Sequence, residues 1–204
     1  AKSLVCVSLN YFTGAPGDRI ARYAHGQDYH RVMGDKLKEL EAFIVSVAPE
    51  AKTKSYVDTG PVLERSYAAR AGLGWIGKHS LLINQHLGSW VLLAGIATTL
   101  PMTADQLVAD QCGTCTLCID ACPTGAIADE REVDARKCIS YLTIEKDGVL
   151  SEHEKSAVAG HLFGCDICQE VCPWNLAPGV TADSAWQPRA GREAVEVKIQ
   201  GKAD

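Results

Sequence analysis

The sequence predicts an α/β (α+β) domain followed by a small cysteine-rich domain. Apolar, strand-like runs alternate with amphipathic, helix-like stretches up to about residue 100. Eight of the nine cysteines then lie between Cys112 and Cys172 in CxxC-type spacing, which is typical of metal ligation. The composition changes just after residue 100, so we expect one domain over 1–105, a second over 106–177 and a loosely ordered tail over 178–204.

The first domain is expected to open with a buried strand over 3–10, where apolar and β-branched residues predominate, and a Gly/Pro loop over 14–17 follows it. Apolar residues then recur at helical spacing from Asp28 to Val47, and Pro49 ends the run. This pattern predicts a long amphipathic helix with Asp28 near its positively polarised N-terminal end.

The rest of the first domain is expected to add strands and one shorter helix. We expect a strand over 55–58, a helix over 62–71 with Gly72 as its C-terminal cap, and a hairpin of two strands over 80–84 and 90–98. The domain would then hold at least three strands.

The second domain is expected to contain an inserted helix between the two halves of its cysteine pattern. Ser151 and Glu154 have the S-x-x-E form of a capping box. We therefore expect a helix from Ser151 to about Phe163.

The cysteine spacing is typical of a two-cluster ferredoxin-like domain. The first run is CxxCxxCxxxCP over 112–123, in which three thiolates hold one 4Fe-4S cluster and the fourth crosses to the other. A split second copy consists of one cysteine at 138 and the run CxxCxxxCP over 165–173. The crossing rule assigns cluster one to Cys112, Cys115, Cys118 and Cys172, and cluster two to Cys122, Cys138, Cys165 and Cys168.

Two zinc sites of four cysteines each would also use CxxC pairs. Three cysteines at successive two-residue gaps, followed by a distant Cys-Pro, are poorly explained by zinc and favour iron–sulfur clusters. Cys6 stands apart in a strand-like run, and we expect it to be a small buried hydrophobic residue without a ligand role.

Two segments nearly match nucleotide and cobalamin motifs. Residues 72–78 fit G-x-G-x-x-G, but a helix is expected before them and a strand after them, which is the reverse of a phosphate loop. A helix C-cap loop that lets a flat ligand approach is favoured instead. Asp28, His30 and Gly34 resemble the D-x-H-x-x-G signature that offers a His to cobalt, with one residue too many. A helix N-terminal turn is preferred there, and a role for His30 in lining a pocket stays open.

Asp58 lies where the strand over 55–58 ends and the chain turns, a common position for a catalytic group in an α/β domain. Most aspartates in such positions only cap turns. The pattern alone leaves both roles open.

Taken together, these segments make the chain resemble the epoxyqueuosine reductases, which are cobalamin-dependent iron–sulfur enzymes of the last step of queuosine biosynthesis in tRNA. The matching segments are HGQDYH at 25–30, DTGPVLER at 58–65, GLGWIGKHSLLIN at 72–84, CGTCTLCIDACPTGAI at 112–127, CISYLTIE at 138–145 and GCDICQEVCPWN at 164–175.

The resemblance implies that base-off cobalamin binds between the α/β domain and the cluster domain, close enough to one cluster to receive electrons. It also implies that Asp58 is the proton donor, and that Asp58, Ser140, Cys165 and Asp166 contact the cobalamin. The substrate would be tRNA carrying epoxyqueuosine, and a flavodoxin or ferredoxin would donate electrons.

Family members usually have a longer N-terminal segment, and often a helical-repeat extension that helps to hold tRNA. Neither is found in this sequence, so we do not expect tight tRNA binding by this chain alone.

Basic residues between 19 and 38 could still form a phosphate-facing patch, although charges on one helix are more often a solvated face. They are Arg19, Arg22, Arg31, Lys36 and Lys38.

Composition and charge narrow the other functional classes. The formal net charge of −5 lacks the basic excess of general nucleic-acid binders, and no apolar run approaches the roughly 20 residues that span a bilayer. We expect a monomeric, cytoplasmic protein.

Two alternative functions remain. One is a ferredoxin-type electron-transfer module, which would not need the first 100 residues. The other is another corrinoid iron–sulfur reductase of the reductive dehalogenase kind, which commonly carries a twin-Arg leader that is not visible here.

Overall fold

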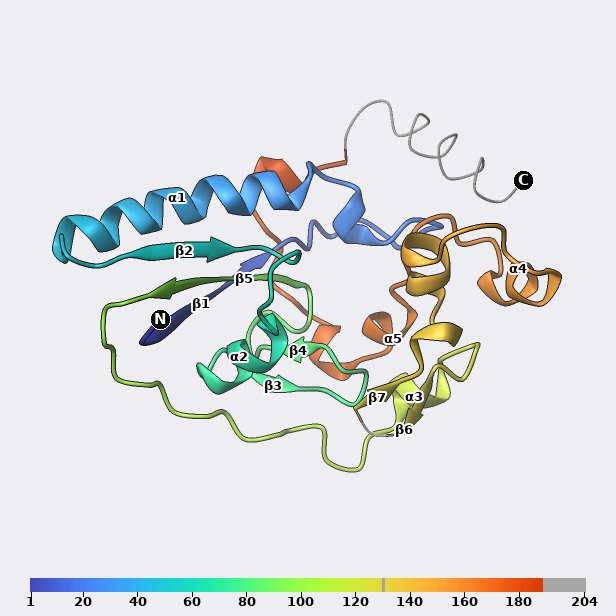
Figure 1. The fold of residues 1–204 in the computed structure, drawn as a ribbon. Coiled ribbons are helices and arrows are strands. Elements are labelled where there is room, and N and C mark those ends of the chain that lie inside the picture. The colour runs from blue at the N-terminus through green and yellow to red at the C-terminus, as the bar shows by residue number, and fades with distance from the viewer. Residues whose placement is uncertain (130, 189–204) are drawn as a thin grey trace.

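The computed structural model describes residues 1–129 and 131–188. A helix and a three-stranded sheet form one end of the molecule, and the short elements of the cysteine-rich region form the other (Figure 1). The prediction of a mixed α/β fold is confirmed, with strands both before and within the cysteine-rich region.

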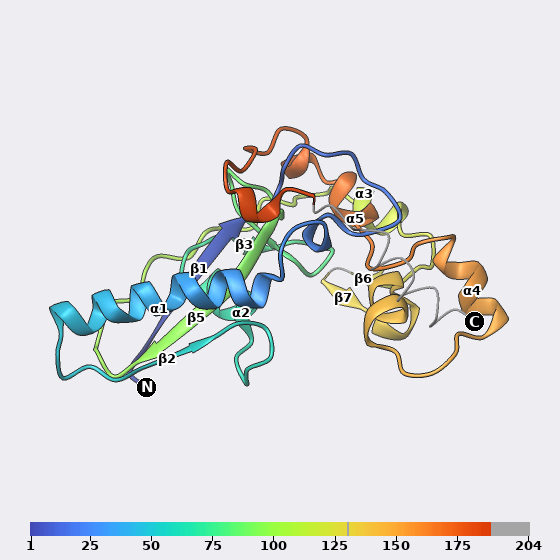
Figure 2. The ribbon, with the colours of Figure 1, turned by 90° about the horizontal axis from the view of Figure 1, so that it is seen from above.

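The main sheet has the strand order β1 (Ser3–Asn10), β5 (Val91–Thr98), β2 (Thr53–Tyr56), and β5 is antiparallel to both neighbours. Helix α1 (Tyr29–Val47) lies across these strands (Figure 2). Its apolar stripe packs on the central strand because Met33, Leu37 and Ile44 face Ala94 and Ile96 of β5. The core of the first part therefore lies between one helix and one sheet face.

The start of α1 follows the prediction, since the Asp28 side chain accepts a hydrogen bond from the His30 backbone N–H at 2.9 Å and caps the helix. Strand β2 ends two residues earlier than expected because Asp58 adopts a left-handed backbone with φ of 55°. Cys6 pairs with Gly95 inside the sheet and is half-buried rather than fully buried.

Helix α2 (Glu64–Arg70) is followed by a small hairpin of β3 (Trp75–Ile76) and β4 (Leu82–Ile83). Gly72 ends α2 with φ of 74°, as a left-handed C-terminal cap requires. The expected hairpin of 80–84 with 90–98 is wrong, because β5 pairs with β1 and β2 instead. A two-residue strand cannot cover an eight-residue one, whereas β1 pairs with β5 along its full length.

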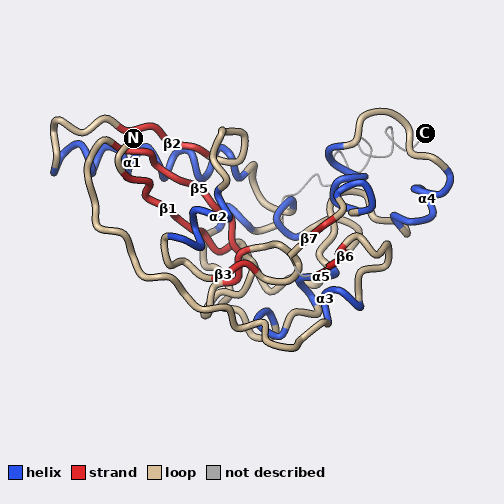
Figure 3. Tube along the Cα trace, turned by 60° about the horizontal axis from the view of Figure 1, so that its bottom comes forward, coloured by secondary structure: helices blue, strands red, loops and turns tan. Residues whose placement is uncertain are grey.

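The cysteine-rich region consists of short elements joined by turns. A long connection over 99–116 leads into it and runs along the outside of the molecule (Figure 3). The elements are α3 (Leu117–Asp120), β6 (Ile127–Asp129), β7 (Glu132–Val133), η2 (Ala135–Lys137), η3 (Tyr141–Glu145), α4 (Glu152–Val158), α5 (Ile167–Glu170) and η4 (Pro173–Asn175).

The expected capping box forms at the start of α4, because Ser151 and Glu154 exchange side-chain and backbone hydrogen bonds. The helix is shorter than expected. It ends at Val158 because Ala159 and Gly160 both have positive φ.

The first residues of the expected loose tail are packed instead. In residues 178–188, the turn η5 (Ser184–Trp186) places Trp186 against Tyr11 and Trp90, and only 2% of Trp186 is exposed. The Ala185 carbonyl also accepts a hydrogen bond from the Gln27 backbone N–H at 2.7 Å. Burial of one large aromatic residue orders this segment despite its mixed composition. The remainder of the predicted tail, 189–204, lies outside the described residues.

A buried polar network joins the two parts of the chain. Ser89, just before β5, donates from its hydroxyl to Gln169 of α5 at 2.9 Å and accepts from Asn175 of η4 at 2.8 Å. Gly88 has φ of 64°, and a side chain there would collide with Asn175, so the two segments approach only because residue 88 is glycine. Satisfied buried networks of this kind fix the relative position of the segments that they link. No helix among the described residues is long and apolar enough to cross a membrane.

Candidate functional site

Two short helices position the cysteines in the same way. Helix α3 carries Cys118 and ends just before Cys122, while α5 carries Cys168 and ends just before Cys172. The backbone N–H of each later cysteine donates to the carbonyl three residues back, at 3.2 Å for Cys122 and 3.1 Å for Cys172. Each tight turn therefore directs its last cysteine away from the cysteines that precede it.

The structure gathers eight cysteines into two groups. Electrostatic interactions link Cys118 and Cys172 to Cys112 and Cys115. Other interactions link Cys165 to Cys122 and Cys138, and Cys168 to Cys165, Cys138 and also Cys118. Cys112, Cys115, Cys118 and Cys172 line one cavity and are called the first group, and Cys122, Cys138, Cys165 and Cys168 line another and are called the second group. That each group holds one cluster stays a prediction.

Four of these thiols hold their protons more tightly than a free cysteine does. Burial raises the pKa of Cys165 to about 11, with a further contribution from Asp166 and from neighbouring cysteines. Burial is also the main reason why the pKa values of Cys118, Cys168 and Cys172 are raised. For Cys122 burial acts in the same direction, but hydrogen bonds from backbone N–H groups and from Thr124 outweigh it and lower the pKa. Metal cations bound at these positions would lower the pKa values of the thiols, because metal-bound cysteine is a thiolate.

Within 1–129 and 131–188, no three His, Cys, Asp or Glu side chains form a group that could hold one metal ion. A zinc site needs four sulfurs about 2.3 Å from one ion, whereas a 4Fe-4S cluster bonds each of four cysteines to a different iron.

The first group lines a cavity of about 330 Å³. The cavity also touches Lys78 and His79 from the loop between β3 and β4, and Trp174 closes part of it. Lys78 is 4% exposed and His79 is 3% exposed, so two polar side chains of the first part are buried beside these cysteines. Burial lowers the pKa of His79 to about 4, and the ring is therefore neutral at neutral pH.

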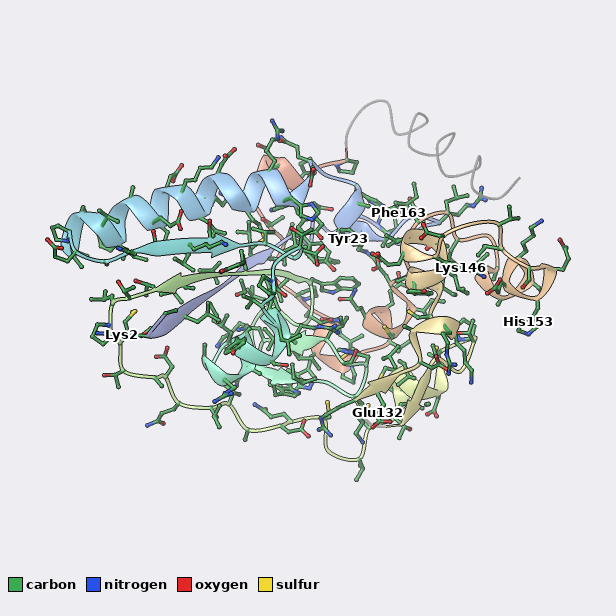
Figure 4. The ribbon with its side chains drawn as sticks, viewed as in Figure 1. Lys2, Tyr23, Glu132, Lys146, His153 and Phe163 are labelled. Atoms are coloured by element: carbon green, nitrogen blue, oxygen red, sulfur yellow. The ribbon has the colours of Figure 1, made fainter. Side chains whose placement is uncertain are left out.

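A larger cavity of about 840 Å³ lies between the two parts of the chain. The second cysteine group lines it on one side, together with Ser140 and Asp166. The other side is formed by residues of the first part, such as Tyr23, Arg65 and Leu92. Figure 4 shows Tyr23 and Phe163 where the two parts meet, and their rings lie 6.2 Å apart. A cavity of this size, with mixed polar and apolar walls, fits a large flat ligand better than a small metabolite.

Asp58 lies near the rim of the large cavity and does not line it. Its carboxylate accepts a hydrogen bond from the Tyr29 hydroxyl at 2.9 Å, and the same oxygen is 3.4 Å from Nε2 of His30. The other ring nitrogen of His30 is 2.8 Å from a carboxylate oxygen of Asp28. The side chain of Asp58 is 61% exposed, so this chain of polar groups meets solvent.

Tyr29 connects Asp58 to the cavity wall. Its ring packs edge-on against Tyr23, with ring centroids 5.9 Å apart. Burial, and then the hydrogen bond to Asp58, raise the pKa of Tyr29 far above its ordinary value. Tyr29 therefore keeps its proton and remains a hydrogen-bond donor to Asp58.

Asp166 is held by the first part of the chain. One oxygen of its carboxylate accepts from the Arg22 backbone N–H at 2.8 Å and lies 3.3 Å from the Arg22 guanidinium. Only 7% of this carboxylate is exposed. Burial raises the pKa of Asp166, and the hydrogen bonds and charge of Arg22 oppose that rise. Because its side chain is occupied, Asp166 can offer a ligand its backbone but not a free carboxylate.

The basic residues between 19 and 38 do not form one open patch. Arg22 is only 11% exposed and also contacts Glu170 and the Trp90 ring. The side chains of the other four each have a partner: Arg19 with the Gly160 carbonyl, Arg31 with Gln27, Lys36 with Asp183 and Lys38 with Asp35.

Sequence reasoning missed two contributors to these sites and left the role of a third open. Tyr29 was not singled out, and a pocket role for His30 was left open, although both side chains reach Asp58 from another element. His79, which directly follows the segment over 72–78, was given no role. The sequence signal for His30 was the D-x-H pattern. A His two residues after an N-cap Asp can bond that Asp through one ring nitrogen and leave the other nitrogen to contact a different element.

The fold and the paired cysteine groups define an iron–sulfur protein in which an α/β part and a cluster-binding part enclose a common cavity. Comparisons with known proteins agree with this class. Residues 111–175 match the family described as 4Fe-4S double cluster binding domain, and residues 1–59 match the family described as Epoxyqueuosine reductase QueG, DUF1730.

Relatives and solved structures point to one kind of protein. An epoxyqueuosine reductase of Cellulophaga algicola is 47% identical over 179 residues, which cover 86% of this chain and 58% of that protein. A crystal structure of epoxyqueuosine reductase with an epoxyqueuosine-modified tRNA-Tyr stem loop has a TM-score of 0.85 and 37% identity, over 91% of this chain and 52% of that one. A Bacillus subtilis epoxyqueuosine reductase, with an aspartate-bearing catalytic loop swung out of its active site, has a TM-score of 0.84 and 35% identity over 91% and 52% of the two chains.

The chain is therefore a homologue of the epoxyqueuosine reductases over most of its own length. It spans little more than half the length of the relatives that it matches.

Proposed function

We propose that this chain reduces epoxyqueuosine to queuosine at the wobble position of tRNA, using base-off cobalamin in the large cavity and electrons from two 4Fe-4S clusters. The observation that carries the proposal is the cavity itself. It has cysteines of the second group in one wall, and Tyr23 in its lining packs against Tyr29, which donates a hydrogen bond to Asp58. A ferredoxin-type module would need no such cavity.

The residues present fit both kinds of cofactor. The two cysteine groups offer four sulfurs each, which is the ligand number of a 4Fe-4S cluster. In the large cavity, Oε1 of Glu64 is buried and has no hydrogen-bond partner in the described residues. A buried acceptor of this kind favours a ligand with N–H donors, and a corrin carries amide side chains around its rim. Ser140 and the backbone of Cys165 and Asp166 would hold the cobalamin.

Removing an epoxide oxygen as water takes up two electrons and two protons. Cobalamin, when bound, would supply the low-potential electron chemistry at the epoxide carbon. The second cysteine group lines the same cavity, so we propose that its cluster, and not the cluster of the first group, passes electrons to that site.

Asp58 would deliver a proton to the oxygen that leaves. Tyr29 orients its carboxylate through the 2.9 Å hydrogen bond, and His30 stands 3.4 Å away as the group that can return a proton. Asp28, 2.8 Å from the far nitrogen of His30, stabilises the positive charge on that ring while it holds the proton. The left-handed backbone at Asp58 identifies its loop as a strained segment, which functional loops often contain. The related Bacillus subtilis structure, with its displaced aspartate loop, supports a loop that moves.

The substrate is proposed from the related structure that contains an epoxyqueuosine-modified tRNA stem loop. The flavodoxin or ferredoxin donor, the monomeric state and the cytoplasmic location stay predictions. So do the domain limits at 105 and 177.

The decisive variant is Asp58→Asn, measured in the full chain loaded anaerobically with iron, sulfide and cobalamin. General acids contribute about 10²–10⁴-fold to a rate, and we expect a loss of turnover in that range with iron content and the cobalamin spectrum unchanged. The control is Asp35→Asn, which removes an exposed carboxylate that pairs only with Lys38 in the described structure. Normal turnover by Asp58→Asn would remove Asp58 from the mechanism. A full complement of iron without cobalamin uptake would leave an electron-transfer module.

A further inference from the structure

His79 is fixed in a defined orientation between the two cavities. It lies in the loop between β3 and β4 and lines both the small and the large cavity. Its Nδ1 accepts a hydrogen bond from the Leu81 backbone N–H at 3.2 Å. Because a donor already faces Nδ1, the ring proton must be on Nε2.

The loop that carries His79 is held rigidly. Ser80 adopts a left-handed backbone with φ of 63°, which is strained for a residue other than glycine. Arg65 stabilises this conformation, since its guanidinium donates to the Ser80 carbonyl at 2.8 Å. The Gly77 backbone N–H closes the loop by donating to the Leu81 carbonyl at 2.8 Å. The direction of the imidazole is therefore set by the loop and not by chance packing.

The Nε2 atom of His79 is buried and has no hydrogen-bond partner among the described residues. The side chain is 97% buried, since only 3% of the residue is exposed. Native proteins rarely leave a buried donor unpaired, and such a donor usually marks a missing ion or ligand. The donor thus needs an acceptor that the polypeptide itself does not supply.

The small cavity offers such acceptors. Its lining brings His79 together with all four cysteines of the first group, among apolar residues such as Leu117 and Trp174. On the large-cavity side, the residues that follow His79 in the lining are Ser80, Leu81 and Leu82. We propose that His79 donates a hydrogen bond from Nε2 to a sulfur of the 4Fe-4S cluster held by Cys112, Cys115, Cys118 and Cys172.

This bond would set how easily that cluster accepts an electron. Reduction adds negative charge to the sulfurs, so a donor stabilises the reduced form more than the oxidised form and raises the reduction potential. His79 would thus help to keep the cluster of the first group reducible by its electron donor. The inference rests on the proposed ligation of that cluster, and not on cobalamin or tRNA.

The test is a redox titration of the full chain, loaded with iron and sulfide and followed by EPR without cobalamin. His79→Phe keeps an aromatic ring but removes the donor, whereas His79→Gln keeps an N–H. We expect His79→Phe to lower the ratio of reduced to oxidised first cluster about fivefold at fixed potential, or about 40 mV at 59 mV per tenfold change. His79→Gln should recover at least half of that shift. The exposed His86, changed to Phe, is the control and should shift neither cluster.

Two further measurements keep the test decisive. Cys115→Ser identifies which EPR signal belongs to the first cluster. Wild-type protein labelled with 15N-histidine should show a weak nitrogen coupling to that cluster, whether or not the His79 variants assemble.

Any one of three results would overturn the inference. They are an unchanged first-cluster potential in iron-replete His79→Phe, a shift confined to the second cluster, which would place the hydrogen-bond donor toward the large cavity, and absence of the nitrogen coupling. A chain that binds no iron would overturn the proposed function as well, so the two failures are distinguishable.

Discussion

Replacing Arg22 by Met should destabilise the whole molecule by separating its two parts. Arg22 belongs to the turn η1 (Arg22–Ala24) of the first part, and its partner Asp166 precedes α5. The two side chains are 11% and 7% exposed. Removing one member of a buried pair leaves the other charge uncompensated, at a cost of about 3–5 kcal/mol. The Arg22 backbone N–H still donates to Asp166 at 2.8 Å in the variant, so we expect about 3–4 kcal/mol.

Thermal unfolding of the cluster-loaded protein, followed by circular dichroism under anaerobic conditions, measures this loss. Globular proteins have an unfolding entropy of about 2 cal/mol/K per residue, so a chain of 204 residues should lose about 7–10 °C in Tm. Glu170→Gln is the control, because Glu170 also pairs with Arg22 but is 40% exposed. An exposed pair contributes at most about 1 kcal/mol, or about 2 °C. If Arg22→Met lowered Tm no more than Glu170→Gln, the buried pair would not hold the two parts together.

The loss of stability in Arg22→Met should also depend on pH. Burial raises the pKa of Asp166, so the folded state binds a proton more readily than the unfolded state does. Stability therefore falls as pH rises through the folded pKa, and it recovers as pH falls toward the ordinary value of about 3.9. Without Arg22 the pKa of Asp166 should rise further. The loss of Tm in Arg22→Met should be larger at pH 8 than at pH 5.5, and an equal loss at both would contradict this reasoning.

Three other predictions concern the packed tail, the inserted helix and the cysteines. Trp186→Ala should cost about 3–5 kcal/mol in unfolding free energy, because it empties a site that is 2% exposed; a loss below about 1 kcal/mol would mean that residues 178–188 do not pack as described. Ser151→Ala removes a helix cap worth about 1 kcal/mol, so the amides of α4 should exchange about fivefold faster in hydrogen-exchange experiments, while those of α1 stay unchanged. Cys115→Ser should lower the content of labile iron, and Cys6→Ser should not, since Cys6 lies in β1 away from both groups; equal iron in both variants would remove Cys115 from the ligands.

Local signals in the sequence predicted the elements that depend on local interactions. The strand β1, the helix α1 with its Asp28 cap, and the capping box at Ser151 are all specified within a few neighbouring residues. The cysteine motif also predicted a two-cluster binding domain, and residues 111–175 match the family of that description. Which cysteines share a cluster stays a prediction.

Features that depend on distant partners could not be predicted in the same way. The strand β5 was expected to pair with its neighbour in sequence, but it reaches its full pairing only with β1 and β2. Trp186 looked like part of a loose tail because its partners, Tyr11 and Trp90, lie far away in the chain. For Asp58, the sequence indicated a turn, but its bond to Tyr29 exists only once α1 lies over the sheet.

The most direct test of the proposed function is a low-temperature EPR spectrum of the iron-replete chain with cob(II)alamin added. If the large cavity holds cobalamin beside the cluster of Cys122, Cys138, Cys165 and Cys168, the cobalt signal should be base-off, without nitrogen splitting, and it should broaden when that cluster is reduced. The spectrum of free, base-on cobalamin, in a protein that carries both clusters, would contradict it.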